Sequence, residues 1–359
     1  MSMSPLFFKV ANAVMPPISG LLCAGTPHRR IARMESTNKI RTIESVEFAE
    51  RFLGGELPVK ELVRRIQAAD RFRSLWLAEG LGQHYANRVI HRNENPKNLF
   101  TEGEGSDIPE NLLLMANAGM ALAFARHHLN RLGSSPSPGA VQETAKRIAD
   151  LVAANALPGY AGISYEAWGM VTRFFYRKVF PGIVESMERI DPGHVANMWH
   201  GAGRACYFFD FMPKWNEPWP VFQRIDREAT GRVSRLNLLA GLGSVTVIVN
   251  MKTPEILETI VRERVAKLPA EDIAAYSQGI SCSMVMRQDT TPDEANARAL
   301  LRHTPTVIAP ELWEQIVAGP ARLALDTIHP KLKAEKRLDD ITSFIPVSEI
   351  LDRRKVSGA

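Results

Sequence analysis

Cysteine is scarce in this chain, with three residues in 359: Cys23, Cys206 and Cys282. Three cysteines make no disulfide framework, and their spacing matches no zinc pattern. Cys206 and Cys282 lie in apolar, helix-like stretches, where a thiol packs as a small core residue more often than it acts as a nucleophile. This usage suits a reducing compartment, so we expect a cytoplasmic protein with neither a metal nor another cofactor.

The chain also lacks a basic block with interleaved aromatic residues, although its net charge is +5. Acidic and basic residues are interspersed, which argues against nucleic acid as a partner. No apolar run reaches the roughly 18 residues of a membrane-spanning helix. The apolar residues 5–24 are interrupted by Lys9 and two prolines, so they predict an amphipathic segment that packs on the protein or contacts a membrane surface.

Known catalytic motifs are missing as well. The sequence has no Gly-x-Ser-x-Gly elbow, no phosphate-binding loop, no His-Glu-x-x-His and no Cys-x-x-Cys. Strand patterns are rare, and the β-branched residues 245–249 occupy a helical position in a repeat. These absences favour an all-α protein whose reaction no motif identifies.

What the sequence does contain is a repeated pair of small residues, set two apart in apolar stretches of helix length. The pairs are Gly80/Gly82, Gly119/Ala121, Ala167/Gly169, Gly201/Gly203, Gly241/Gly243 and Gly279/Ser281. Glycine inside a helix costs about 0.5–1 kcal/mol relative to alanine, so the pairs need a packing reason. Positions i and i+2 lie about 200° apart on a helix, which allows neighbouring helices to approach closely on two nearly opposite flanks.

The small pairs recur every 34 to 48 residues, which is a period typical of helical repeats. Helix-starting prolines stand between them, at Pro138, Pro192, Pro254 and Pro292. We therefore expect an all-α array of about six αα-hairpin repeats, either a superhelical solenoid or a closed α/α toroid. An irregular bundle with tight helix crossings is the alternative.

The chain should divide into three parts. Residues 58–303 should form the helical-repeat domain. Residues 1–57 should form an N-terminal lead-in, with a connector over residues 26–44 and a short helix over residues 45–53. Residues 304–359 are interrupted by prolines and charged, which predicts a C-terminal cap and tail.

One face of the repeated helices should line a lumen or concave surface. It contains the residues just before and just after each small pair: Glu79, Ala118, Glu166, His200, Ala240 and Gln278, then Gln83, Leu122, Met170, Arg204, Ser244 and Cys282. A buried carboxylate costs several kcal/mol unless it is paired, so Glu79 and Glu166 should find Arg204, Arg173 or His200. The residues between the small pairs are all apolar and should be buried.

Glu166, His200 and Glu79 are the candidate catalytic residues, because a carboxyl group with a raised pKa beside a histidine can act in acid–base catalysis. The candidate substrate-binding residues come from the same helices: Arg204, Asn197, Gln278, Tyr165 and Trp168. The alternative is a structural polar network that ties the helices together. Their spacing indicates no metal site.

Ordered segments of the chain carry a family resemblance: residues 76–80 (WLAEG), 200–208 (HGAGRACYF), 240–243 (AGLG), and 277–279 (SQG) with Arg287. In these segments the chain resembles a bacterial family of unknown function that is encoded with enediyne polyketide biosynthesis genes. The likeness covers about residues 70–303, and Tyr165 stands where that family has a histidine. It implies a cytoplasmic accessory protein of natural-product biosynthesis without an established reaction.

Three functional hypotheses follow. The first is a lumen that binds an apolar, polyene- or polyketide-like small molecule and isomerises or cyclises it. The second is a non-catalytic helical scaffold that docks other biosynthetic proteins. The third is a terpenoid-type cyclase, in which a buried carboxylic acid protonates an alkene, although the acidic motifs of such enzymes are missing. An enclosed apolar cavity fits the first and third hypotheses, whereas a scaffold predicts an open groove.

Overall fold

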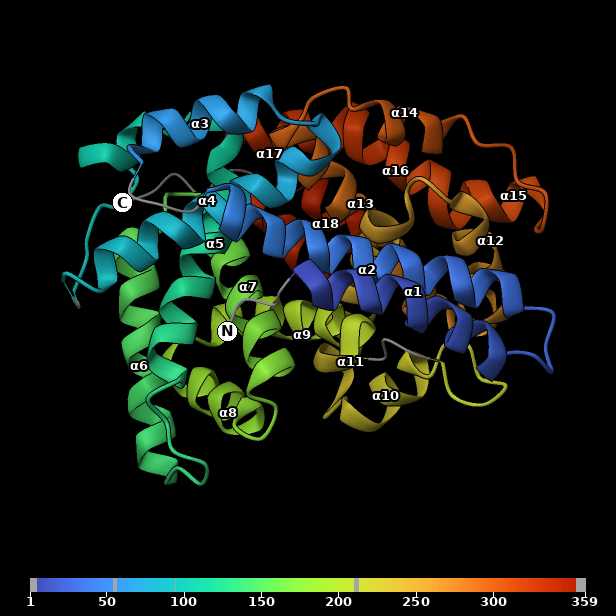
Figure 1. Cartoon of the computed structure of the whole chain (residues 1–359), viewed down its shortest axis with the longest axis horizontal. Coiled ribbons are helices and arrows are strands. Elements are labelled where there is room, and N and C mark those ends of the chain that lie inside the picture. The colour runs from blue at the N-terminus through green and yellow to red at the C-terminus, as the bar shows by residue number, and fades with distance from the viewer. Residues whose placement is uncertain (1–4, 54–56, 94, 210–212, 353–359) are drawn as a thin grey trace.

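The computed structural model describes residues 5–53, 57–93, 95–209 and 213–352, except the side chains of residues 5–7 and 46–51. All the regular elements in these ranges are helices (Figure 1), which confirms the all-α prediction. A β-bridge joins Lys214 and Glu217.

Six long helices carry the paired small residues: α4 (Arg71–Ile90), α5 (Glu110–Leu129), α7 (Ala161–Phe175), α9 (Val195–Phe209), α11 (Arg232–Asn250) and α13 (Ala270–Thr290). Each of them packs against the next one in chain order. Other helices stand before, after and between most of them along the chain: α3 (Val59–Ala68), α6 (Pro138–Asn155), α8 (Phe180–Ile190), α10 (Val221–Glu228), α12 (Pro254–Glu263) and α14 (Ala295–Leu301). Between α4 and α5 the described residues form only a 3-10 turn, Gly103–Asp107.

The glycines of the long helices bring neighbouring backbones into direct contact. A Cβ atom built on Gly241 of α11 would lie 1.9 Å from the carbonyl oxygen of His200 on α9. One built on Gly243 would lie 2.0 Å from the carbonyl oxygen of Tyr276 on α13, on the other flank. Side chains cannot fit at such distances, so only glycine allows this helix spacing. Equivalent contacts confirm the predicted close approach at Gly82, Gly119, Gly169, Gly201, Gly203 and Gly279.

The residues between the small pairs form the apolar side of each long helix. All six are fully buried, as predicted: Leu81, Met120, Trp168, Ala202, Leu242 and Ile280. The β-branched residues 245–249 lie inside α11, which confirms their helical assignment. Among the described residues, α11 is the one helix long and apolar enough to cross a membrane, but 89% of that stretch is buried inside the protein.

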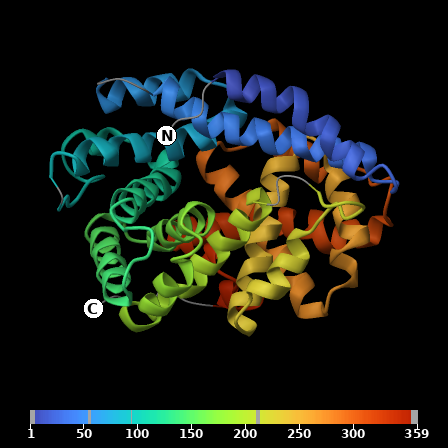
Figure 2. The ribbon, with the colours of Figure 1, turned by 60° about the horizontal axis from the view of Figure 1, so that its bottom comes forward.

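The N-terminal residues differ from the expected connector and short helix. They form two helices, α1 (Pro5–Leu22) and α2 (Arg29–Phe52), which lie side by side across the long helices (Figures 1 and 2). Helix α2 contacts α4, α11 and α12. Most of the basic residues that suggested a connector, such as Arg30, Arg33 and Arg41, lie on the exposed side of α2, whereas Ala32 and Ile40 are buried.

The C-terminal helices α16 (Gly319–Leu323) and α17 (His329–Glu335) pack against α13, and α15 (Pro310–Trp313) precedes them. These short helices continue into one another through two π-helical turns, Glu314–Ala318 and Ala324–Ile328. Proline clashes with the carbonyl group four residues earlier, and a wider turn before Pro320 and Pro330 accommodates it. The last described helix is α18 (Val347–Asp352). The domain boundaries at residues 57 and 303 remain a prediction.

Candidate functional site

An apolar cavity of about 710 Å³ lies between the α1–α2 pair and the long helices α4, α5, α7 and α9. Such a volume is typical of sites for small organic ligands. Four polar side chains of the described residues line it, those of Thr42, Glu79, Gln83 and Arg126. The rest of the wall is apolar and includes Phe8, Val14, Leu122, Met170, Phe174 and Phe208.

Part of the predicted lumen face lines this cavity. Glu79 and Gln83 come from α4, Leu122 from α5 and Met170 from α7, each directly before or after a small pair. The helix packing explains their position, since the carbonyl group of Glu79 itself contacts Gly119. The glycine contacts therefore hold these side chains next to the adjacent helix.

Glu79 has the most unusual environment in the cavity wall. Its side chain is 5% exposed, and its Oε1 atom has no hydrogen-bond partner among the described residues. Burial raises the pKa of Glu79 to about 7, against the opposing influence of Arg204 and Arg126 and with the help of the negative charge of Glu166. At neutral pH this carboxyl group can therefore both donate and accept a proton.

Behind Glu79 lies a buried ion pair. Arg204 Nη1 donates to both carboxylate oxygens of Glu166, at 2.8 and 2.9 Å, and His200 Nδ1 lies 3.3 Å from Glu166 Oε1. Burial alone would raise the pKa of Glu166, but the charge of Arg204 and the hydrogen bond from His200 outweigh it and lower that pKa. Glu166 is thus held as an anion, and Arg204 carries the neutralising charge. The expected pairing of Glu166 with Arg204 and His200 is present.

Two of the candidate substrate-binding residues contact the protein's own C-terminal segment instead of the cavity. Asn197 Nδ2 donates to Thr342 Oγ1 at 2.9 Å. Gln278 Nε2 donates to the carbonyl oxygens of Ile341 and Ser343, both at 3.0 Å. Their amide groups are therefore used to hold residues 338–344 against α9 and α13.

Tyr165 and Trp168 also lie away from the cavity. The Tyr165 ring stacks on His194, with 4.1 Å between ring centroids, and burial together with the nearby Asp191 raises the Tyr165 pKa. Trp168 is fully buried, and its indole Nε1 has no hydrogen-bond partner among the described residues. Both side chains therefore belong to the packing around α7.

On α11 and α13, the remaining residues of the predicted lumen face are buried in contacts between these two helices. Ser244 and Ser283 share a hydrogen bond of 2.9 Å between their hydroxyl groups. Burial raises the pKa of Cys282 to about 12, which keeps this thiol protonated and unreactive, as its apolar setting predicted. Among the described residues, no three histidine, cysteine or acidic side chains are grouped for a metal ion.

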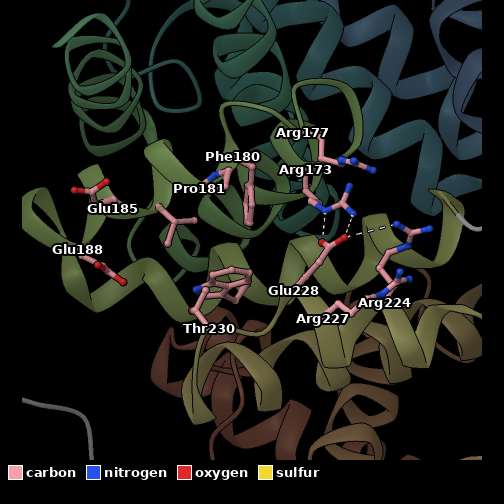
Figure 3. A pocket seen from close by; sticks show the side chains of 12 residues that line it. Arg173, Arg177, Phe180, Pro181, Glu185, Glu188, Arg224, Arg227, Glu228 and Thr230 are labelled. Atoms are coloured by element: carbon pink, nitrogen blue, oxygen red, sulfur yellow. Dashed lines mark hydrogen bonds and ion pairs between the residues drawn. The ribbon is translucent and has the colours of Figure 1, made fainter. Parts of the chain in front are cut away.

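A second hollow, of about 630 Å³, lies between α7, α8, α9 and α10 (Figure 3). Figure 3 shows Arg173 and Arg224 directed at Glu228. Arg173 Nε donates to Glu228 at 2.7 Å, and an Arg224 nitrogen lies 3.7 Å from the same carboxylate. The charges at its centre are thus already paired, and the apolar cavity is the better candidate for a ligand site.

Arg126, Phe174 and Phe175 line the cavity without having been predicted from the sequence, and so does the part of α2 that was expected to be a connector. A signal for two of these residues was present, because Arg126 and Phe174 each follow a predicted face residue by four positions. Comparisons with protein-family models, with curated proteins and with solved structures give no match to this chain.

Proposed function

We propose that the protein binds an elongated, neutral, apolar small molecule in this cavity, with Glu79 as the group that recognises its polar end. The observation that carries the proposal is a buried carboxyl oxygen that has no hydrogen-bond partner among the described residues, on the wall of a mainly apolar cavity. A ligand hydroxyl or carbonyl group would pair with this carboxyl group, and the ligand's hydrocarbon body would fill the apolar lining.

The shape and lining of the cavity also support a role in natural-product biosynthesis. A polyene- or polyketide-like molecule combines a long apolar body with few polar groups, and the resemblance to the enediyne-associated family supports a role as an accessory protein for such compounds. A docking scaffold is a weaker hypothesis, because α1 and α2 cover the cavity that an open groove would leave accessible.

The long helices would form the wall of this site as an array of αα-hairpins. From α5 onward another helix stands between each long helix and the next, which supports that description. The last long helix also returns to the first ones: Arg287 Nη1 donates to the Phe72 carbonyl at 2.8 Å, and Asn111 Nδ2 donates to the Thr290 carbonyl at 3.0 Å. These contacts favour a closed array over an open solenoid.

Proton transfer to the bound molecule is a second candidate function, and the pKa of about 7 at Glu79 favours it. Glu79 would give its proton to one carbon of a double bond, and the resulting cation would return a proton from a neighbouring carbon to the carboxylate. The net result is an isomerisation or cyclisation that consumes no other reactant. Glu166 would stay ionised beside Arg204 and would take no part in the proton transfer.

Binding of the polyene alcohol retinol, followed by its fluorescence, tests the proposal. Met170→Trp should fill part of the cavity and weaken binding roughly tenfold or more, since a contact worth about 1.4 kcal/mol changes affinity tenfold. Val233→Trp places the same side chain at an exposed position of α11 and should bind as the wild type does. Equal affinities for wild type and Met170→Trp would reject the cavity as the ligand site.

The catalytic candidate needs a separate test. Cells that make the natural product and carry Glu79→Gln should accumulate a precursor that wild-type cells convert, as analysed in cell extracts. The reason is that glutamine keeps the shape of the side chain and cannot give up a proton. Glu143→Gln, at an exposed position of α6, serves as the control. Identical metabolites in all three strains would reject proton transfer by Glu79 and leave the binding proposal standing.

A further inference from the structure

One side of α1 is apolar but faces solvent. Val10, Val14, Ile18 and Leu21 recur at helical spacing and are 53%, 44%, 37% and 60% exposed. At about 100° per residue these positions fall within one narrow sector of the helix. An exposed apolar stripe of this kind is typical of a surface that contacts another apolar phase.

The stripe continues into the mouth of the cavity. Val10 and Val14 line the cavity as well as being exposed, and so do Phe175 and Phe209 from the ends of α7 and α9. Trp215, which is 68% exposed, lies near the other end of α1, where the adjacent residue Asn216 donates its backbone N–H to the Leu22 carbonyl.

Basic residues surround this apolar surface. The first 34 residues contain Lys9, Arg29, Arg30 and Arg33 and no acidic residue, so they hold four of the five net positive charges of the chain. The three arginines are exposed at the start of α2. At the cavity mouth, the guanidinium group of Arg126 lies 4.9 Å from the centre of the Phe175 ring, and those of Arg177 and Arg224 lie 5.5 and 4.6 Å from the Phe209 ring.

We propose that this face, formed by α1 and the cavity mouth, rests on the surface of an anionic lipid bilayer, from which the cavity receives its apolar ligand. Apolar side chains with flanking cations are the chemistry that binds a helix in the plane of an anionic membrane, and aromatic residues favour the interface. Lys9 and the two prolines within α1 fit a helix that lies in this plane rather than one that crosses the membrane. The ligand route rests on the proposed function, whereas the membrane contact does not.

Flotation of the full chain with lipid vesicles tests the proposal. The wild type should float with vesicles of phosphatidylcholine and phosphatidylglycerol, should remain unbound with phosphatidylcholine alone, and should bind more weakly as salt is added. Ile18→Asp and Leu21→Asp alter exposed positions outside the cavity wall. Each should reduce the bound fraction roughly tenfold, because burial of one leucine-sized side chain in the bilayer strengthens binding by at least that factor.

Val233→Asp is the matched control, because Val233 is also exposed (57%) but lies far from the α1–α2 pair. It stands at the start of α11, whereas the contact of α11 with Asn38 of α2 is made by Asn250 at the other end of that helix. It should bind vesicles as the wild type does. Absence of wild-type flotation, or equal flotation of Leu21→Asp, would overturn the proposal, as would a self-associated wild type that Leu21→Asp converts to a monomer. Retinol binding measured without vesicles should be unchanged in Leu21→Asp, so a failure of the membrane contact is distinguishable from a failure of the ligand site.

Discussion

At the scale of single residues, Glu79 defines the chemistry of the cavity. Its ordinary pKa is 4.5 and burial raises it to about 7, so the folded protein holds a proton that the unfolded chain has already released between these values. The stability that this proton contributes is fully present below pH 4.5 and is lost as the pH rises through 7.

Glu79→Gln should therefore remove a pH dependence of stability. A shift of this size corresponds to on the order of 3 kcal/mol, because each pKa unit is worth about 1.4 kcal/mol. The wild type should lose that much free energy of unfolding between acidic and slightly alkaline solution, relative to the variant, in urea titrations. Glu143→Gln on the exposed side of α6 should retain the wild-type profile. Parallel profiles for wild type and Glu79→Gln would show that Glu79 titrates normally.

The ion pair behind Glu79 leads to a second prediction. Glu166→Gln leaves the cation of Arg204 buried without its partner, and such a loss costs about 3–5 kcal/mol. The double variant Glu166→Gln with Arg204→Met removes both charges and should be more stable than Glu166→Gln alone. Urea unfolding of the two single variants and the double variant measures the coupling. Additive losses would mean that the 2.8 Å contact contributes nothing to stability.

At the scale of helices, the glycines set the distances. Gly241→Ala would place a methyl group 1.9 Å from the His200 carbonyl oxygen, so α9 and α11 must move apart. Overpacking of this kind costs about 1–3 kcal/mol. Gly139→Ala on α6 has nothing within 4 Å of the new atom and should stabilise the protein by about 0.5–1 kcal/mol through helix propensity. Thermal unfolding of both variants tests these two expectations. A Gly241→Ala protein as stable as the wild type would contradict the tight contact between α9 and α11.

Much of the helix arrangement could be predicted from the sequence. The spacing of the small residues located the six long helices, because the apolar stretch of helix length around each small pair is a local feature of the sequence. Starts at prolines were less reliable. Ser137 and Pro138 begin α6 as expected, but α14 begins at Ala295, where Glu294 provides the cap instead of the residues around Pro292.

The cavity could be predicted only in part. Glu79, Gln83, Leu122 and Met170 were on the expected face because helical periodicity fixes which residues share a face. Which part of that face is covered by protein depends on contacts between distant segments. Residues 338–344 occupy one part of it through Asn197 and Gln278, and no local pattern in the sequence indicates that pairing.

At the scale of the whole molecule, the two ends of the chain pack differently on the long helices. The C-terminal segment is fixed by side chains of the long helices, including Asn237, whose Oδ1 accepts the backbone N–H of Phe344 at 2.6 Å. The N-terminal helix α1 packs mainly against α2 (Figure 2). It also contributes the outer wall of the cavity. Access to the cavity is therefore expected on the side of α1.

This arrangement predicts a local opening of α1. Pro16 and Pro17 have no backbone N–H and interrupt the hydrogen bonds of this helix, so its amides should exchange with deuterium faster than those of the buried helix α11. Retinol should slow the exchange in α1 and at the ends of α7 and α9, since a ligand that binds only the closed form stabilises it. Met170→Trp should show no such slowing. Exchange in α1 as slow as in α11, and unaffected by retinol, would place the route to the cavity elsewhere.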